Sequence, residues 1–231
     1  MKANLVTKTR KINEILETVL GFPEKKAKHA DPLESLILTI LSQNTNDINS
    51  FRAFESLNVT YSRPDEKADW ARIAADPRKN IAKAIRIGGL ANQKSETIQN
   101  ILNWLKQEYG DYDLGFLCDM DPWEAVPLFT QHKGIGVKTI SVVLCFSCGA
   151  DIFPVDTHVN RICHRLGLVD AKFNAEKTFR AMQELVPPNK SFSLHLNMIR
   201  LGREICQSRK PKCQECPLAG ECEHIRTQNQ S

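Results

Sequence analysis

Four cysteines near the C-terminus form the strongest chemical pattern in this 231-residue sequence. They are Cys206, Cys213, Cys216 and Cys222, with six, two and five residues between successive thiols. Four thiolates in one short hydrophilic segment can hold a tetrahedral zinc ion or the four iron corners of a [4Fe-4S] cluster. Structural zinc sites usually present two close cysteine pairs far apart in sequence, whereas here one pair is flanked by longer arms. The spacing favours an iron–sulfur cluster, and zinc is the alternative.

A second candidate site lies in the middle of the sequence, where Gly134 and Gly136 form a tight turn before the apolar run 140–146. Glycines let a backbone approach a ligand closely, and the unpaired amides at a helix start can hold a phosphate without reading a base. Lys138 follows this turn after a single residue, Val137. A plain turn between helices and a surface lysine would give the same pattern, so the segment alone leaves both interpretations open.

Asp156 follows Lys138 by eighteen positions and begins an apolar-striped helix that runs through Ile162 and Leu166. Aspartate is a preferred N-cap residue, so capping alone could explain it. The combination is more restrictive than any part, because a glycine turn with a lysine, an aspartate at this offset and the cysteine pattern occur together in one chain.

Helical periodicity dominates the rest of the chain and predicts an all-α fold whose apolar stripes form the core. An N-cap followed by a first-turn proline at Asp31-Pro32 begins one helix, and residues 21–23, Gly110 and Pro187-Pro188 are expected to end others. The stripes comprise Ile12, Ile15, Leu16, Val19 and Leu20; Leu33, Leu36, Ile37, Ile40 and Leu41; and Ile98, Ile101, Leu102 and Leu105.

The composition is that of an ordinary globular chain, with 42% apolar and 25% charged residues and a net charge of +4. General disorder is excluded, and the charge permits a polyanionic partner without demanding one. Neither a spanning apolar segment nor a secretory signal is present, so we expect an intracellular protein. The remaining cysteines, Cys118, Cys145, Cys148 and Cys163, are then expected to be reduced thiols that pack as small apolar residues.

In combination, these motifs resemble the endonuclease III family, the iron–sulfur type of helix-hairpin-helix DNA glycosylases. Residues 41–47 resemble the family's Gln/Asn-bearing loop at the DNA opening, and residues 85–94 resemble its wedge loop. The resemblance covers nearly the whole chain and implies an all-α fold of two helical domains. A six-helix domain with the helix-hairpin-helix would span residues 26–150, and residues 1–25 and 151–231 would form the iron–sulfur cluster domain.

The resemblance implies a bifunctional DNA glycosylase and AP lyase of base excision repair. Lys138 would attack C1′ of a flipped-out nucleotide, form a Schiff base and allow β-elimination on the 3′ side. An amine attacks only when neutral, so partial desolvation and the helix N-terminus would have to lower the pKa of Lys138. Asp156 would remain ionised and stabilise the positive charge that develops on the sugar. Oxidised pyrimidines are the default substrate.

The resemblance also implies the residues that contact DNA. Leu90 would intercalate as the wedge and Asn44 would fill the space that the extruded nucleotide leaves. Without the resemblance, Leu90 would be interpreted as a core leucine. Gly134 and Gly136 would hold the DNA backbone, and Lys210, on the arm between the first two cluster cysteines, would contact a phosphate.

Three positions depart from the family pattern. His132-Lys133 replaces a common Leu-Pro before the hairpin, Gln43-Asn44 replaces a single glutamine, and Gly88 replaces a larger residue before the wedge. We expect these positions to touch DNA near the lesion, so they bear on substrate choice more than on reaction type. The alternatives are a glycosylase for mismatched thymine or uracil and a non-catalytic iron–sulfur DNA-binding protein.

The expected partner is double-stranded DNA that contains a damaged or mismatched base. One enzyme acting on one lesion suggests a monomer, and no membrane association is expected. The sequence is typical of a cytoplasmic, nucleoid-associated, prokaryotic-like protein without a targeting signal.

Overall fold

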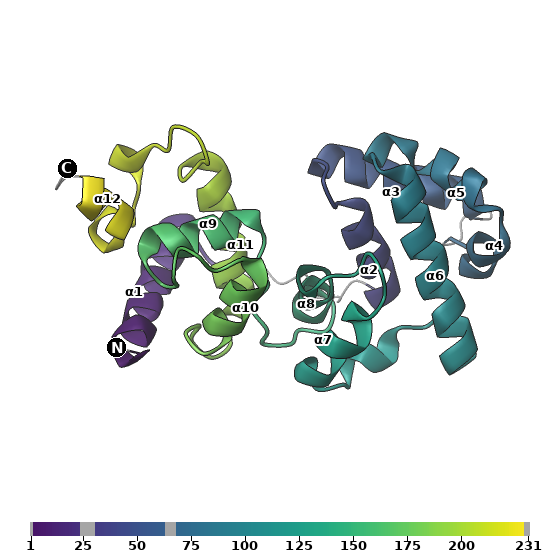
Figure 1. The fold of residues 1–231 in the computed structure, drawn as a ribbon, viewed down its shortest axis with the longest axis horizontal. Coiled ribbons are helices and arrows are strands. Elements are labelled where there is room, and N and C mark those ends of the chain that lie inside the picture. The colour runs from purple at the N-terminus through teal and green to yellow at the C-terminus, as the bar shows by residue number, and fades with distance from the viewer. Residues whose placement is uncertain (1, 24–30, 63–67, 229–231) are drawn as a thin grey trace. The chain divides into compact units, whose positions relative to one another are not determined.

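The computed structural model describes residues 2–23, 31–62 and 68–228. Within these ranges the protein is all-α, as predicted, and its sole β feature is an isolated bridge between Ser62 and Ala68. The chain divides into two compact units (Figure 1). We call residues 28–149 the middle unit, and residues 1–27 with 150–231 the terminal unit. No helix in the described ranges is long and apolar enough to cross a membrane.

The described helices of the middle unit are α2 (Pro32–Leu41), α3 (Asp47–Tyr61), α4 (Trp70–Ala75), α5 (Arg78–Ala84), η1 (Arg86–Gly88), α6 (Ala91–Tyr109), η2 (Gly115–Cys118), α7 (Pro122–Thr130) and α8 (Val137–Phe146). Helix α2 lies at the centre and packs against α3, α6 and α8. Leu36, Ile37 and Ile40 of α2 are fully buried, because this helix is apolar around most of its circumference.

The described helices of the terminal unit are α1 (Lys2–Leu20), α9 (Thr157–Leu166), α10 (Ala175–Gln183), α11 (Ser191–Glu204), η3 (Cys213–Glu215), η4 (Ala219–Glu221) and α12 (Glu223–Gln228). Helix α1, purple in Figure 1, packs on α11 although the two are far apart in sequence. Helices α10, α11 and α12 also pack on α9. The N-terminal helix and the cysteine segment therefore belong to the same unit.

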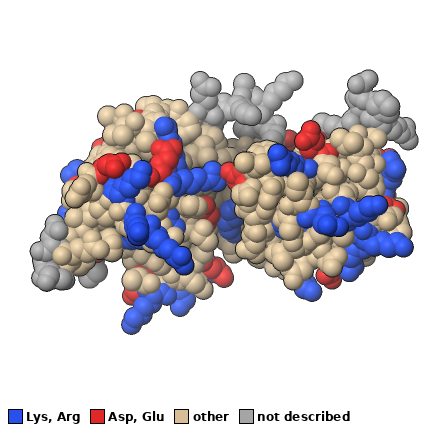
Figure 2. Space-filling view, turned by 90° about the horizontal axis from the view of Figure 1, so that it is seen from above, with Lys and Arg blue, Asp and Glu red and all other residues tan. Residues whose placement is uncertain are grey.

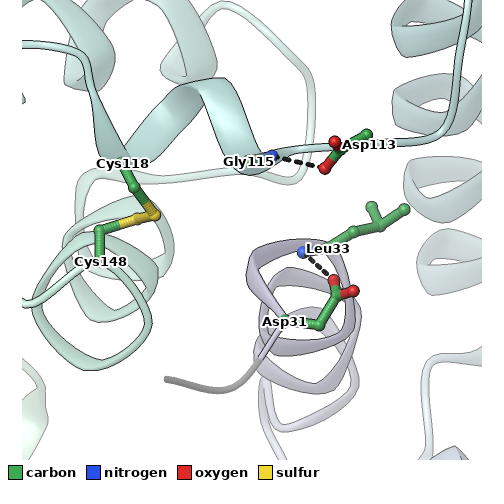
Figure 3. The surroundings of a disulfide bond; sticks show 6 residues. All are labelled: Asp31, Leu33, Asp113, Gly115, Cys118 and Cys148. Atoms are coloured by element: carbon green, nitrogen blue, oxygen red, sulfur yellow. Dashed lines mark hydrogen bonds between the residues drawn. A yellow bond between two sulfur atoms is a disulfide. The ribbon is translucent and has the colours of Figure 1, made fainter. Parts of the chain in front are cut away.

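The predicted helix boundaries are confirmed where local chemistry sets them. Asp31 caps α2 by accepting a hydrogen bond from the Leu33 amide (Figure 3) and another from the Glu34 amide, and Pro32 follows at the first helical position. Such a cap stabilises a helix by about 1 kcal/mol. Helix α1 ends directly before Gly21, and α6 ends at Gly110, whose φ of 77° is the left-handed conformation that glycine adopts at low cost.

The prediction for four of the cysteines is half right. Cys145 and Cys163 are buried and form no disulfide bond, as expected. Cys118 and Cys148 are not reduced core thiols, because a disulfide bond joins them (Figure 3). Cys118 ends η2 and Cys148 follows α8, so both lie at helix ends, where the backbones approach to a Cα–Cα distance of 4.6 Å. The apolar run 140–146 led to the prediction that Cys148 packs in the core, whereas Cys148 lies at the edge of the core.

Candidate nucleic-acid interface and active site

The glycine hairpin joins α7 to α8, and its first glycine fits a space that no side chain could enter. Gly134 has a φ of 92°, and a Cβ atom placed there would stand 2.1 Å from Oγ1 of Thr97 on α6. The Thr97 hydroxyl itself donates a hydrogen bond to the Lys133 carbonyl at 3.3 Å. Gly134 is therefore required both by its left-handed backbone and by the close approach of α6.

The second hairpin glycine has a different environment. Gly136 is exposed and extended, with a φ of −96°, and a Cβ atom placed there would meet nothing within 4 Å. It is the N-cap of α8, yet no side chain caps the amides of the first turn. Internal packing does not explain this glycine, whereas open space beside uncapped amides suits the approach of an anionic group.

His132, one of the departures from the family pattern, packs against aromatic side chains as an apolar residue would. Its ring lies 4.5 Å from the Trp104 ring, centroid to centroid, and packs against Phe129 at 6.4 Å. Burial lowers the pKa of His132, because the charged imidazolium would lose its hydration there. The hairpin thus begins from a buried aromatic contact rather than from a Leu-Pro pair.

Lys138 stands in the first turn of α8 and is half-buried. Lys138 thus follows the open Gly136 by two residues, within the middle unit. Asp156 belongs to the terminal unit and is the N-cap of α9, where its Oδ1 accepts a hydrogen bond from the Val159 amide at 2.8 Å. The capping role that the sequence allowed for Asp156 is therefore confirmed.

The cap uses only one oxygen of the Asp156 carboxylate. Its second oxygen, Oδ2, makes no hydrogen bond among the described residues. The Cys163 thiol lies in the core behind it, and burial together with the Asp156 charge raises the pKa of Cys163 to about 12. Cys163 therefore remains a neutral packing residue, and Asp156 retains acceptor capacity beyond the cap.

The loop after α2 separates the roles of Gln43 and Asn44. The Gln43 side-chain amide donates hydrogen bonds to the Gly134 carbonyl at 2.9 Å and to Thr139 Oγ1 at 3.2 Å. Gln43 is thus occupied in fixing the hairpin to this loop. Asn44, by contrast, is exposed and has a φ of 51°, so its side chain is the one presented outward.

Leu90 is presented in a similar way at the loop between η1 and α6. It is 48% exposed and left-handed, with a φ of 49°, directly before the first residue of α6. An apolar side chain held outward on a strained backbone is not core packing. The structure thus excludes the interpretation of Leu90 as an ordinary core leucine.

The expectation that Gly88 touches DNA is wrong. Gly88 is buried, and a Cβ atom placed there would stand 3.1 Å from the Ala53 side chain and 3.9 Å from Nζ of Lys94. The small residue is required by the close packing of η1 on α3 and by the lysine beneath it. The departure from the family pattern at this position therefore has an internal packing reason.

The four cysteines of the terminal unit line one small cavity together with Arg165, Ile205 and Ile225. No carboxylate lines this cavity. Burial and the three neighbouring thiols both raise the pKa of Cys216, so the sulfur atoms are close enough to interact electrostatically. No three His, Cys, Asp or Glu side chains of the described ranges are placed to bind a single metal ion. Four soft ligands around a shared space suit a cluster with separate iron corners.

Two arginines of α9 hold the segment that leads into the cysteines. Arg161 donates to the Cys206 carbonyl at 2.8 Å and to the Gly202 carbonyl at 3.0 Å. Arg165 donates to Cys206 Sγ at 3.2 Å and to the Gln207 carbonyl at 2.7 Å. Sequence reasoning missed both. They are four residues apart and so share a helix face, but the sequence gives no sign of partners some forty residues away.

The arm between Cys206 and Cys213 presents three exposed cations, Arg209, Lys210 and Lys212. Lys210 has a φ of 52°, an uncommon conformation for a residue with a side chain, at the exposed part of the arm. Figure 2 shows Lys and Arg side chains on the visible face of both units, interspersed with Asp and Glu.

Comparison with protein families matches two models to these regions. The HhH-GPD superfamily of base excision DNA repair proteins matches residues 37–188, and the iron–sulfur binding domain of endonuclease III matches residues 206–222. An endonuclease III of Thermotoga maritima is 34% identical over 210 residues, which cover 91% of each protein. The chain belongs to the endonuclease III family.

A second sequence relative and a solved structure are also similar to this chain. A plant homologue from Arabidopsis thaliana is 36% identical over 198 residues, and the chain spans 65% of that relative's length. A solved non-covalent endonuclease III–DNA complex superimposes with a TM-score of 0.80 at 24% identity, covering 98% of this chain and 99% of that one. The structural likeness confirms the predicted all-α fold of two helical domains.

This endonuclease III family member is a base excision repair enzyme of the DNA glycosylase class. The iron–sulfur match begins at Cys206 and ends at Cys222, the outermost cysteines of the predicted pattern. The cofactor is a [4Fe-4S] cluster, as the cysteine spacing indicated. Zinc, the alternative left open by the sequence, is not supported.

Proposed function

We propose that this enzyme is a bifunctional DNA glycosylase and AP lyase whose preferred substrate is an oxidised pyrimidine in double-stranded DNA. The observation that carries the proposal is the place of Lys138, half-buried in the first turn of α8 and two residues after the open Gly136. A lysine amine at this place, in a glycosylase of the HhH-GPD superfamily, supplies the nucleophile that a combined excision and lyase reaction requires.

DNA binding begins with the backbone. The uncapped amides at the start of α8 bind a phosphate, which the absence of a side chain at Gly136 allows to approach closely. Lys210 on the cysteine arm contacts a second phosphate. Leu90 enters the base stack while Asn44 occupies the space left by the extruded nucleotide, and together they offset part of the cost of unstacking.

The reaction then proceeds on the extruded sugar. Neutral Nζ of Lys138 forms a bond to C1′ as the glycosidic bond breaks. The electron pair of the glycosidic bond leaves with the base, which takes up a proton. The Asp156 carboxylate stabilises the positive charge on the sugar and accepts the proton that the lysine loses. The sugar ring opens to a Schiff base, and loss of a C2′ proton expels the 3′ phosphate. Water finally releases the unsaturated aldehyde from Lys138.

The cluster has a structural role in this proposal. Cys206, Cys213, Cys216 and Cys222 are its ligands, because all four line the same cavity. When bound, the cluster cross-links the arm that carries Lys210 to the body of the terminal unit. We further propose that the protein acts as a monomer on chromosomal DNA, without membrane association.

A panel of duplexes tests the proposal. Each duplex contains thymine glycol, a G·T pair, a G·U pair or no lesion, and products are separated with and without alkali. We expect strand cleavage at thymine glycol without alkali. Excision confined to G·T or G·U would show that the enzyme acts on mismatched bases instead. Strand cleavage that occurs only after alkali would show that the enzyme has no lyase activity. Binding without excision of any base would leave a non-catalytic DNA-binding protein.

A further inference from the structure

Lys94 is a buried lysine that the proposed reaction does not use. Lys94 is the fourth residue of α6, and it is 2% exposed. Its Nζ donates hydrogen bonds to the Leu41 carbonyl at 2.7 Å and to the Gly88 carbonyl at 2.8 Å. Among the described residues no carboxylate forms an ion pair with it. Both partners are backbone carbonyls, so the ammonium group holds main chain rather than balancing a charge.

The two carbonyls lie at the bases of the two loops that present side chains outward. Leu41 is the last residue of α2, three positions before Asn44, and Gly88 is the last residue of η1, two positions before Leu90. Carbonyls at helix ends have no partner within their own helix, so an outside donor can fix them. One ammonium group therefore joins the base of the Asn44 loop to the base of the Leu90 loop.

A lysine at this buried position carries a desolvation cost that its two hydrogen bonds must offset. Burial lowers the pKa of Lys94, because the charged form loses its hydration in the core. An uncharged side chain of similar length would fill the same space without that penalty. What an apolar side chain cannot do is donate to two carbonyls at once. The small Gly88, whose added Cβ would lie 3.9 Å from Nζ, leaves room for this arrangement.

We propose that Lys94 is a positioning residue that fixes the separation between Asn44 and Leu90, so that both side chains engage the duplex together when a nucleotide is extruded. The inference rests on the proposed function, because it assigns to Lys94 the geometry of base extrusion. Both loops lie within the middle unit, so the arrangement does not depend on how the two units are placed.

The test compares Lys94→Met with a matched control. Lys106 lies on the same helix, and its Nζ also donates to a backbone carbonyl, that of Gly110 at 2.7 Å, but at an exposed site away from the two loops. Single-turnover excision of thymine glycol is measured in duplex and in single-stranded DNA. Lys94→Met should slow excision from the duplex by about 10- to 100-fold and leave the single-stranded rate nearly unchanged. Lys106→Met should change neither rate.

A binding measurement separates this inference from the chemistry. A duplex that carries a stable abasic analogue opposite 2-aminopurine reports unstacking by fluorescence without any bond breaking. We expect the wild type and Lys106→Met to raise the fluorescence and Lys94→Met to raise it less at saturation. If the wild type excises no base, the proposed function fails while the fluorescence still tests Lys94.

Two results would overturn the proposal: unchanged duplex excision and fluorescence in Lys94→Met, or equal losses on duplex and single-stranded DNA, which indicate a general packing defect. Should Lys94→Met not fold, Lys94→Gln takes its place, because its side chain is one bond shorter and cannot hold both carbonyls in the same geometry; the same loss on the duplex is expected. A Leu90→Ala, Lys94→Met double variant supplies an independent check. If Lys94 acts through Leu90, its effect on duplex excision should shrink when Leu90 is already truncated, and full additivity would contradict the assignment.

Discussion

The Thr97 hydroxyl occupies the space in which a side chain on Gly134 would have to stand, at 2.1 Å from the position of the missing Cβ atom. Gly136, two residues later, has no atom within 4 Å of the same position. The two glycines of one hairpin therefore have different reasons to be glycine. Gly134 is fixed by the protein's own packing, and Gly136 borders open space that a ligand can fill.

The glycine pair gives the first prediction. Gly134→Ala should destabilise the middle unit by about 1–3 kcal/mol, because the new methyl group displaces Thr97 and the backbone remains left-handed. Gly136→Ala should leave stability within about 0.5 kcal/mol of the wild type but weaken DNA binding. Chemical denaturation and fluorescence anisotropy measure the two effects. Equal stability losses in both variants, or full DNA affinity in Gly136→Ala, would contradict this division.

The hairpin should also loosen in acid through His132. Burial lowers its pKa in the folded state below the ordinary value near 6.5, so the open hairpin binds a proton more readily than the closed one. The closed form keeps its full stability above pH 6.5 and loses part of it as the pH falls from 6.5 toward the lowered pKa. Hydrogen exchange in residues 131–136, corrected for intrinsic rates, should therefore show less protection at pH 5.5 than at pH 7.5.

The control for His132 is His132→Leu, which retains an apolar contact with Trp104 and cannot titrate. Its hairpin protection should be independent of pH over this range. If acid reduces protection equally in the wild type and in His132→Leu, another group is responsible.

Lys210 is predicted to act through charge alone. Lys210→Glu should weaken binding to duplexes of different sequence by a similar factor and reduce the slope of log affinity against log salt by about one. Lys172→Glu makes the same charge change at an exposed position of the terminal unit outside the arm. If both variants lose affinity equally, net charge rather than the position of Lys210 explains the effect.

Asp156→Asn separates capping from catalysis. Asparagine caps helices about as well as aspartate, so folding and the visible absorption of the cluster should survive. The negative charge is lost, and excision should fall by about 10²–10³-fold. Asp31→Asn makes the same change at the N-cap of α2 and should remain active. An active Asp156→Asn variant would reduce Asp156 to a cap.

Local chemistry made much of this molecule predictable from its sequence. Asp31 with Pro32 set the start of α2, Gly110 set the end of α6, and the cysteine spacing indicated the cofactor. Contacts between distant residues were not predictable. Nothing in the sequence links Gln43 to Gly134, 91 positions away, or pairs Cys118 with Cys148. Lys94 is the sharpest case, because lysines are almost always exposed and only the folded backbone brings two carbonyls to this one.

The central claim is that the amine of Lys138 becomes covalently joined to the sugar of the excised nucleotide. Borohydride reduces a Schiff base to a stable amine, so incubation with a thymine glycol duplex and borohydride should trap a protein–DNA adduct. Peptide mapping by mass spectrometry should place the sugar on Lys138, and Lys138→Gln should give no adduct while still binding the duplex. Efficient base excision by the wild type with no trapped adduct, or an adduct mapped to another residue, would contradict the account.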